Sequence, residues 1–372
     1  MSFLYENLLL LTWQQVTMWV IGGILIYLAI AKEMEPSLLL PIGFGAILVN
    51  LPFSGAVDQF INGIFQEGPL TSLYHAGIAN ELFPLLLFIG IGAMCDFGPL
   101  LTNPKLMMFG AAAQFGIFFT FCLASMFFPA NDAASIATIG AADGPTAIVV
   151  AQKLQSTYLG PIMVAAYSYM ALVPIIQPPV IRFLTTKEER MIRMDYEPKE
   201  VSRTTRILFP IIITVIAGLI SPASVSLVGF LMFGNLLKEC GVLNGLSDTA
   251  QGAMANMITL LLGITVASQM QAENFLQVDT LMILGMGLFA FVFDTAGGVM
   301  FAKLLNLFLS KKVNPMIGAA GISAFPMSGR IIHKMGLEED NQNFLLMHSM
   351  GVNVSGQIAS VIAGGLIMSF FM

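Results

Sequence analysis

Charged side chains are scarce in this chain, and their scarcity excludes a water-soluble domain. Only 10% of the 372 residues are charged, whereas soluble domains carry about 25%. The hydrophobic share is 56% and the net charge is −6. So few basic residues leave no surface suited to nucleic acid. The composition therefore predicts an integral membrane protein with no nucleic-acid partner.

Cysteine and the common catalytic motifs are also scarce. Cys95, Cys122 and Cys240 lie in or beside apolar segments, at spacings that fit neither a metal site nor a disulfide framework. The chain has no P-loop, GxSxG or HExxH motif, which excludes nucleotide hydrolysis and the commoner hydrolases. The first 15 residues lack a basic start and a small-residue cleavage site, so we interpret them as an interfacial helix and not as a removable signal peptide.

Long apolar runs are what the sequence has in abundance. About 20 apolar residues in a helix cross the roughly 30 Å hydrocarbon layer of a membrane. Two apolar segments, 37–51 and 81–95, are too short or too rich in Gly and Pro for a straight span. The segments that qualify as spans are 16–31, 106–128, 157–181, 207–220, 281–293 and 344–371. The fold class predicted is an all-α polytopic helical bundle in a membrane.

One polar segment interrupts the apolar pattern. Residues 182–206 hold seven of the sixteen basic residues, and basic residues near span ends stay in the cytoplasm. We therefore predict a cytoplasmic loop. Either the loop is a solvated linker whose charge only sets the topology, or it docks a soluble partner.

The two halves on either side of this loop resemble each other. Residues 76–94 align with 252–270, and IGAADGP at 139–145 aligns with IGAAGIS at 317–323. Leu106-Met107 also aligns with Leu281-Met282. Such matched, Gly- and Pro-interrupted segments are typical of transporters built from repeats with broken or re-entrant helices. We expect inverted repeats, although the sequence alone does not show their orientation.

These patterns divide the chain into four parts. They are an N-terminal interfacial helix with the first transmembrane helix (1–36), a first repeat with the Asp143 re-entrant element (37–181), the basic loop (182–206), and a second repeat with a re-entrant element at 314–330 (207–372).

Asp143 is the strongest functional candidate. An ionisable group inside a membrane costs about 2.5–3.5 kcal/mol on insertion scales. Asp143 stands between Gly140 and Pro145, and both residue types oppose a regular helix and leave backbone carbonyls free. A carboxylate beside free carbonyls suits a hard monovalent cation. The alternative is an aspartate that only caps the helix starting at Pro145.

Two further ionisable groups, Asp294 and Lys303, are nine residues apart and cannot pair within a regular helix. We interpret the DTAGG sequence that starts at Asp294 as another helix break. Pairing with other spans is as compatible with these residues as a transport role.

The second half offers a different set of groups. Glycine follows the shared IGAA there, so the two elements cannot be equivalent. Asn314 and Ser323 supply neutral oxygens, and Arg330 is a fixed cation suited to a carboxylate ligand or, alternatively, a snorkelling arginine at a helix end. Tyr169 is expected to bury its hydroxyl, and the last span adds Asn353, Ser355 and Gln357.

Four stretches carry a resemblance to a known family. GAADGPTAIVV, AAYSYMALVPIIQPP, VNPMIGAAGISAFPM and GVNVSGQIAS resemble the β subunit of sodium-pumping, biotin-dependent decarboxylases. That family includes oxaloacetate, methylmalonyl-CoA, glutaconyl-CoA and malonate decarboxylases. The resemblance runs from about Pro41 to Gly365.

The resemblance implies a division of labour. A carboxyltransferase subunit moves CO₂ from the substrate to biotin, and a biotin carrier protein brings carboxybiotin to the membrane. The β subunit then releases CO₂ and exports Na⁺ while biotin takes up a proton. A small membrane subunit, a homo-oligomeric assembly and a multi-pass location in the cell inner membrane are also implied.

The resemblance also assigns roles to residues. Asp143 matches an essential intramembrane aspartate that binds Na⁺ and exchanges it for H⁺, and Asn353 matches an asparagine near that Na⁺ site. Tyr169 and Ser323 match residues implicated in a second cation site and in proton delivery.

Three more positions match the second re-entrant element of the family. Asn314 and Gly318 match cation-site positions, and Arg330 matches an arginine that meets carboxybiotin. The short N-terminal half favours an acyl-CoA decarboxylase over the oxaloacetate type, but the β subunit never touches the acyl substrate.

Two other classes suit the same residues on physical grounds. A Na⁺-coupled carboxylate symporter would use the same broken helices and the same Asp, Asn and Ser side chains. A passive anchor for a soluble decarboxylase has no use for a buried Asp143.

Overall fold

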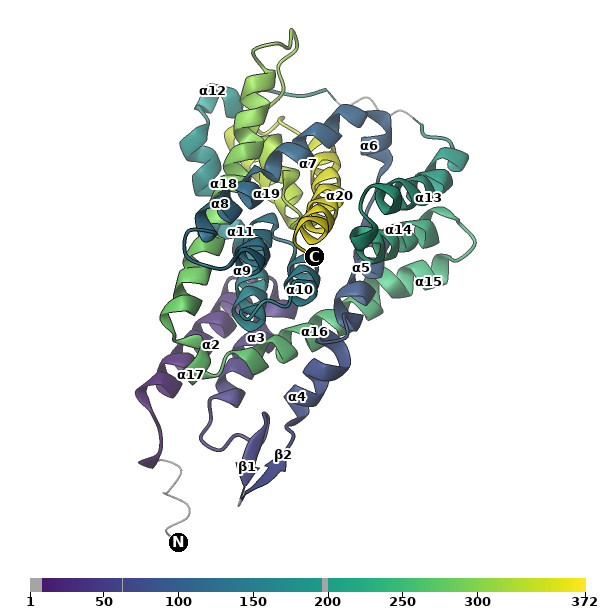
Figure 1. Cartoon of the computed structure of the whole chain (residues 1–372). Helices are drawn as coiled ribbons and strands as arrows, with labels where there is room; N and C mark the ends of the chain where they lie inside the picture. Colours follow the sequence, from purple (N-terminus) through teal and green to yellow (C-terminus); the bar gives the residue numbers. More distant parts are fainter. Residues whose placement is uncertain (1–8, 62, 196–199) are drawn as a thin grey trace.

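The computed structural model describes residues 9–61, 63–195 and 200–372 and is almost entirely helical (Figure 1). Within these residues, seven helices are long and apolar enough to cross a membrane, and a bent pair of shorter helices makes an eighth candidate. The only strands described are β1 (Gln59–Ile61) and β2 (Ile64–Gln66), which pair antiparallel. The structure confirms the prediction of an all-helical, multi-pass membrane protein.

The helical segments of the first half are α2 (Trp13–Ala31), α3 (Pro36–Val49), α4 (Pro69–Leu73), the π-helical turn η1 (Tyr74–Ile78), α5 (Leu82–Met94), α6 (Gly98–Thr102), the 3₁₀ turn η2 (Pro104–Leu106), α7 (Met107–Ala113), α8 (Phe115–Ala124), α9 (Ala130–Ala137), the 3₁₀ turn η3 (Thr138–Ala141), α10 (Gly144–Lys153) and α11 (Leu159–Leu184).

Those of the second half are α12 (Lys187–Arg190), α13 (Arg203–Ile220), the 3₁₀ turn η4 (Pro222–Ser224), α14 (Val225–Glu239), α15 (Asn244–Thr249), the π-helical turn η5 (Ala250–Met254), α16 (Ala255–Val266), the 3₁₀ turn η6 (Ala267–Gln269), α17 (Ala272–Phe275), α18 (Val278–Leu305), the 3₁₀ helix η7 (Pro315–Gly321), α19 (Met327–Glu339) and α20 (Leu346–Phe371).

The predicted spans coincide with real helices, with two exceptions. The span at Asn244–Gln269 was not predicted, because its first turns carry several polar side chains. The break predicted at DTAGG is wrong, because α18 continues through it. Gly298 of α18 packs directly on η7. A Cβ atom added at Gly298 would lie 2.0 Å from the Gly318 carbonyl oxygen. The predicted interfacial helix falls largely on residues 1–8, which lie outside the described part of the chain.

Helix ends tie several spans to the side of the molecule that carries the loop 182–206, which we call the loop face. Lys303 at the end of α18 donates to the Leu184 carbonyl at the end of α11, at 2.9 Å. Asn343, just before α20, donates to the Arg190 carbonyl at 2.8 Å. Helices α11 and α18 therefore run toward the loop face, and α20 runs away from it.

The opposite face holds the other ends of these helices. Tyr158, just before α11, donates to Asp279 in the first turn of α18 at 2.9 Å. Phe121 of α8 packs on Phe371 at the end of α20, with ring centroids 5.1 Å apart. Helices α7 and α8 thus run parallel to α20 and antiparallel to α18.

This direction is informative because the sequence alignment pairs α7 and α8 with α18. The same alignment pairs the π-turn η1 and α5 with the π-turn η5 and α16. Asn50 at the end of α3 donates to the Met270 carbonyl beyond α16, and Asn235 near the end of α14 donates to the Cys95 carbonyl beyond α5. Helix α3 of the first half thus packs on α16 of the second half, and α14 of the second half packs on α5 of the first. Such reciprocal packing, between counterparts that run antiparallel, is expected of inverted repeats. The internal repeat itself stays a prediction.

Helix α20 lies at the centre of the bundle. In its most apolar stretch 67% of the residues are buried, against 11% in α13 and 22% in α2, which lie at the periphery. The polar side chains of its middle turns, from Asn353 to Ser360, therefore face protein and can build a site away from lipid.

Candidate functional site

Two hairpins enter the bundle from opposite faces and meet at their tips. The first hairpin (residues 130–153) contains α9, η3 and α10, and the second hairpin (residues 314–339) contains η7 and α19. The backbone N–H of Ser323 donates to the Ala141 carbonyl at 2.9 Å, so the tips are joined main chain to main chain. Next to this contact, Ala142 has a left-handed φ of 52°, a strained conformation for a residue with a Cβ atom.

Asp143 follows at the tip of the first hairpin and is 2% exposed. Its Oδ1 accepts the backbone N–H of Thr146 at 3.3 Å, so it caps α10, as the alternative interpretation required. Its Oδ2 accepts three side-chain donors: the Thr146 hydroxyl at 2.9 Å, the Gln357 amide at 3.1 Å and the Ser360 hydroxyl at 2.8 Å. Because Oδ2 has these three donors and Oδ1 has one, Oδ1 keeps free acceptor capacity.

The donors on α20 continue as a polar stripe. Asn353, Gln357 and Ser360 are spaced i, i+4 and i+7, which puts them on one face of the helix. Asn353 is fully buried and its amide nitrogen donates to the Ala320 and Ile322 carbonyls of the second hairpin, at 3.1 and 2.7 Å. Its Oδ1 has no hydrogen-bond partner. This buried, unpaired oxygen lies one turn along α20 from Gln357, which contacts Asp143, and a bound cation would satisfy it.

Tyr167 is a site residue to which the sequence assigned no role. Its ring packs on Gly144, where a Cβ atom would lie 2.6 Å from the ring, so only glycine fits beside it. Its hydroxyl is buried and has no hydrogen-bond partner. The signal was the Tyr167-Ser168-Tyr169 run in an apolar span, but periodicity could not select which tyrosine faces Asp143.

Tyr169, which the sequence analysis favoured, points elsewhere. Its hydroxyl donates to the Leu284 carbonyl on α18, and its ring packs on Gly287 of the same helix. The described contacts do not bring it to Ser323, whose hydroxyl donates to the Gly356 carbonyl at 3.1 Å. Ser323 lies at the hairpin junction, as expected, and Tyr169 lies against α18.

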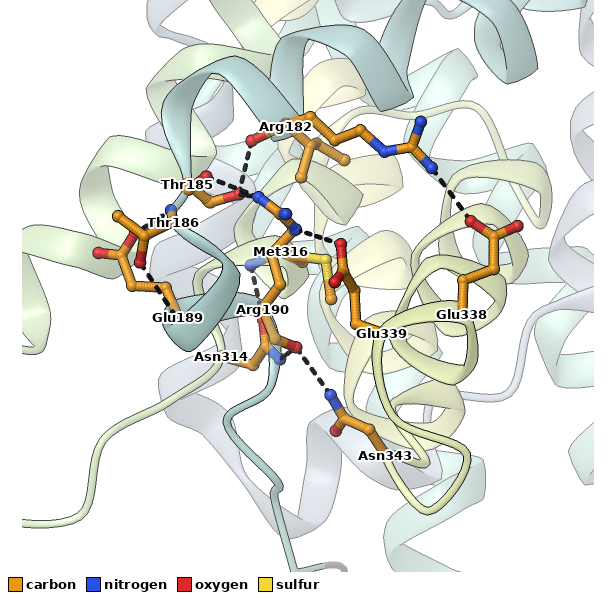
Figure 2. Close-up of polar contacts among 11 residues, drawn as sticks. Arg182, Thr185, Thr186, Glu189, Arg190, Asn314, Met316, Glu338, Glu339 and Asn343 are labelled. Atoms are coloured by element: carbon orange, nitrogen blue, oxygen red, sulfur yellow. Dashed lines mark hydrogen bonds and ion pairs between the residues drawn. The ribbon is translucent and has the colours of Figure 1, made fainter.

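Asn314 lies at the base of the second hairpin, on the loop face (Figure 2). Its amide donates to the Arg190 and Ile192 carbonyls at 2.8 and 2.9 Å. Seven residues of 3₁₀ helix separate it from the tip, which is about 14 Å at 2.0 Å per residue. Asn314 therefore cannot share a cation with Asp143, and its role at a cation site stays a prediction for a separate place. Gly318, also predicted as a cation-site position, packs on Gly298.

Figure 2 shows how the loop face holds this base. Arg190 donates to Glu339 at 2.6 Å and to the Thr185 carbonyl at 2.7 Å, while Arg182 pairs with Glu338 at 3.1 Å. The first turns of the 182–206 loop are thus bonded to the end of α19. Lys303 joins them through an ion pair with Glu189, so its pairing is structural.

Arg330 has a different environment from the other arginines. Of the arginines in the described residues, it alone has a side chain without a hydrogen bond or ion pair. It is exposed, one turn into α19 beyond the second tip. Burial raises the pKa of Glu35 and the Arg330 guanidinium lowers it, which identifies Glu35, at the start of α3, as a neighbour that the sequence analysis missed.

The charge of the Asp143 site sets the ion that it can take. Within the described part of the chain, no three His, Cys, Asp or Glu side chains gather, so Asp143 is not part of a cluster of acidic metal ligands. One carboxylate with neutral amide and hydroxyl oxygens suits a hard monovalent cation, whereas transition metals prefer imidazole and thiolate ligands.

Comparison with known proteins agrees with this geometry. The profile of the family described as Na⁺-transporting oxaloacetate decarboxylase beta subunit matches residues 14–371. The methylmalonyl-CoA decarboxylase subunit beta of Propionigenium modestum is 48% identical over 374 residues, covering 96% of this chain and 94% of that protein. A probable oxaloacetate decarboxylase beta chain of Vibrio cholerae serotype O1 is 44% identical over 418 residues, covering 97% and 96%.

A third relative has another substrate in its name. The glutaconyl-CoA decarboxylase subunit beta of Acidaminococcus fermentans is 46% identical over 360 residues, covering 96% of this chain and 93% of that protein. The family resemblance predicted from the sequence is confirmed: this chain belongs to the family of Na⁺-transporting decarboxylase β subunits.

Proposed function

We propose that this protein releases CO₂ from carboxybiotin and uses that reaction to export Na⁺ across the cell inner membrane, with uptake of a proton. Na⁺ is the transported substrate, and Asp143 is the residue that binds it. The decarboxylase that it serves acts on an acyl-CoA or an oxo acid.

The observation that carries the proposal is the combination of a buried carboxylate and an unpaired amide oxygen at the meeting point of two hairpins. Asp143 Oδ1 has free acceptor capacity, and Asn353 Oδ1 has no partner. The three donors on Oδ2 stabilise the charged form of Asp143, and a Na⁺ ion beside Oδ1 would offset the remaining cost of burying that charge.

Arg330 is the residue proposed to receive carboxybiotin. A guanidinium can hold a carboxylate through two parallel N–H···O bonds, and Arg330 has both of its edges free of protein partners. In the reaction the bond between the biotin nitrogen and the carboxyl carbon breaks, CO₂ leaves, and the nitrogen takes a proton. Removing water from the carboxylate favours this step.

The proposed path of the proton to biotin passes Ser323 at the hairpin junction, and Tyr169, against α18, lies outside that junction. Ser323 belongs to the second tip and also bonds to the first, so events at biotin and at Asp143 act on one junction. Coupling then requires that Na⁺ and carboxybiotin favour different arrangements of the two hairpins, because a ligand shifts an equilibrium only by its differential affinity.

The proposed partners are a biotin carrier protein, a carboxyltransferase subunit and a small membrane subunit, in a complex with more than one copy of this chain. The soluble partners are proposed to dock on the loop face. The 182–206 loop lies on that face, and the second hairpin, which contains Arg330, has its base there.

The test compares two buried aspartates of the first hairpin. Asp143→Asn should abolish Na⁺-stimulated decay of free carboxybiotin and ²²Na⁺ uptake into inverted vesicles, while the protein stays in the membrane. Asp132→Asn is the matched control, because Asp132 is also buried but binds only Ser156 and Thr157 at the hairpin base. Full Na⁺ stimulation in Asp143→Asn would refute the proposal.

The same preparation separates the two rival classes. Capture on avidin should recover this chain together with a biotin-bearing protein, and added Na⁺ should accelerate carboxybiotin decay. A carboxylate symporter would give neither result, and a passive anchor would give only the first.

A further inference from the structure

A second buried carboxylate, Asp294, lies in α18 and has no role in the proposed transport reaction. It is fully buried. Its Oδ1 accepts the backbone N–H of Ile117 at 3.1 Å, at the break between α7 and α8, where that N–H also donates to the Gln114 carbonyl at 3.1 Å. Its other oxygen, Oδ2, has no hydrogen-bond partner.

No positive group within the described residues compensates a charge on Asp294. Lys303 is nine residues further along α18, about 13.5 Å at 1.5 Å per residue, and pairs with Glu189. The helices packed on α18 add Arg182, which pairs with Glu338, Asp132, which is bonded at the first hairpin's base, and Tyr169, whose hydroxyl is bonded to Leu284. An uncompensated carboxylate in such a place is strongly disfavoured relative to its neutral acid.

The surroundings of Oδ2 select a proton over Na⁺. A Cβ atom on Gly140 would lie 3.0 Å from Oδ2 and 2.8 Å from the Ala290 Cβ, so the main chain at Gly140 packs closely on this oxygen and on Ala290. A metal cation needs several oxygen ligands around it, and no side chain within the described residues forms a hydrogen bond with Oδ2. A proton needs only the carboxyl oxygen itself.

We propose that Asp294 is a second intramembrane proton-binding site, occupied by a proton when the first hairpin lies against α18. The inference goes beyond the proposed function and does not require Asp143 to bind Na⁺. Gly140 is three residues before Asp143, so the segment that presses on Asp294 also carries the tip of the first hairpin. Loss of the proton would place an unpaired charge against η3 and favour separation of the hairpin from α18.

Infrared spectroscopy of the purified protein tests the proposal. In wild-type protein at neutral pH and saturating Na⁺, we expect the carbonyl stretch of a protonated aspartic acid, identified by its shift on ¹³C-aspartate labelling. The band should persist in Asp143→Asn and disappear in Asp294→Asn, whose amide preserves both shape and neutrality.

Either of two results would overturn the inference. One is a wild-type spectrum without any protonated-aspartate band, which needs no variant to fold. The other is a folded Asp294→Asn protein that keeps the whole wild-type band. Both readouts are independent of turnover, so a failure here is distinct from a failure of the Na⁺ site, which the Asp143→Asn transport assay reports.

Discussion

Ser360→Ala tests whether the charge on Asp143 governs Na⁺ binding. The Ser360 hydroxyl donates to Asp143 Oδ2 at 2.8 Å, and both side chains are buried. The substitution removes one of the three side-chain donors on that oxygen and leaves Gln357 and Thr146 in place. The ionised form of Asp143 is therefore destabilised without removal of the carboxylate.

The expected size of the effect follows from the type of hydrogen bond. A bond to a charged group contributes about 1.5–3 kcal/mol, and 1.4 kcal/mol is about tenfold in a binding constant. We take the lower end because Gln357 and Thr146 continue to stabilise the charge. The half-saturating Na⁺ concentration should then rise by about tenfold.

The assay is the Na⁺ dependence of carboxybiotin decay in the reconstituted complex. Ser355→Ala is the matched control, since Ser355 is a fully buried serine on the same helix whose hydroxyl contacts only the Leu106 and Val352 carbonyls. It should cost stability but leave the half-saturating Na⁺ concentration unchanged. If Ser360→Ala also left that concentration unchanged, Asp143 would not be the ion's ligand.

Two further predictions concern the second hairpin. Arg330→Gln should raise the KM for carboxybiotin without changing the half-saturating Na⁺ concentration. The KM of Arg330→Lys should lie between those of wild type and Arg330→Gln, because lysine keeps the charge and loses the bidentate geometry. Arg182→Gln, at an exposed arginine paired with Glu338, serves as control, and equal KM values for all three variants would contradict the role of Arg330. The hydrogen bond from Arg193 lowers the pKa of Asp340, so the attachment of the loop is present above the ordinary aspartate pKa of about 3.9 and is lost as pH falls through the lowered value. Hydrogen exchange of residues 186–195, corrected for the intrinsic rate, should accelerate only in that acidic range, and acceleration already near neutral pH would speak against it.

The spans could be predicted because a membrane imposes one physical requirement on all of them. Segment 281–293 was apolar enough to be found, and it lies within α18. Local composition failed where packing overrode it. Gly297 and Gly298 suggested a break, yet they allow close contact between α18 and the neighbouring backbones. The polar start of Asn244–Gln269 hid a span whose remaining turns are apolar.

The site was partly predictable for a related reason. Asp143 stood out because burying a carboxylate in a membrane is costly, and the structure does place its side chain in a buried position at the hairpin junction. Tyr167 and Tyr169 were not separable, because residues two apart on a helix face nearly opposite directions and the sequence does not say which direction is inward. Asn314 was placed in the correct segment, but its distance from the tip depends on the 3₁₀ geometry of η7.

The bond from the Ser323 amide to the Ala141 oxygen gives the molecule an unusual kind of robustness. It uses only main-chain atoms, which every residue type except proline supplies, so substitutions at either position can alter the neighbouring chemistry while the two tips stay hydrogen-bonded. Proline at 323 is the one coded exchange that deletes the donor itself. Side chains near the hairpin junction can therefore change in evolution, and with them the ion that the site prefers, while the main-chain contact between the tips is kept.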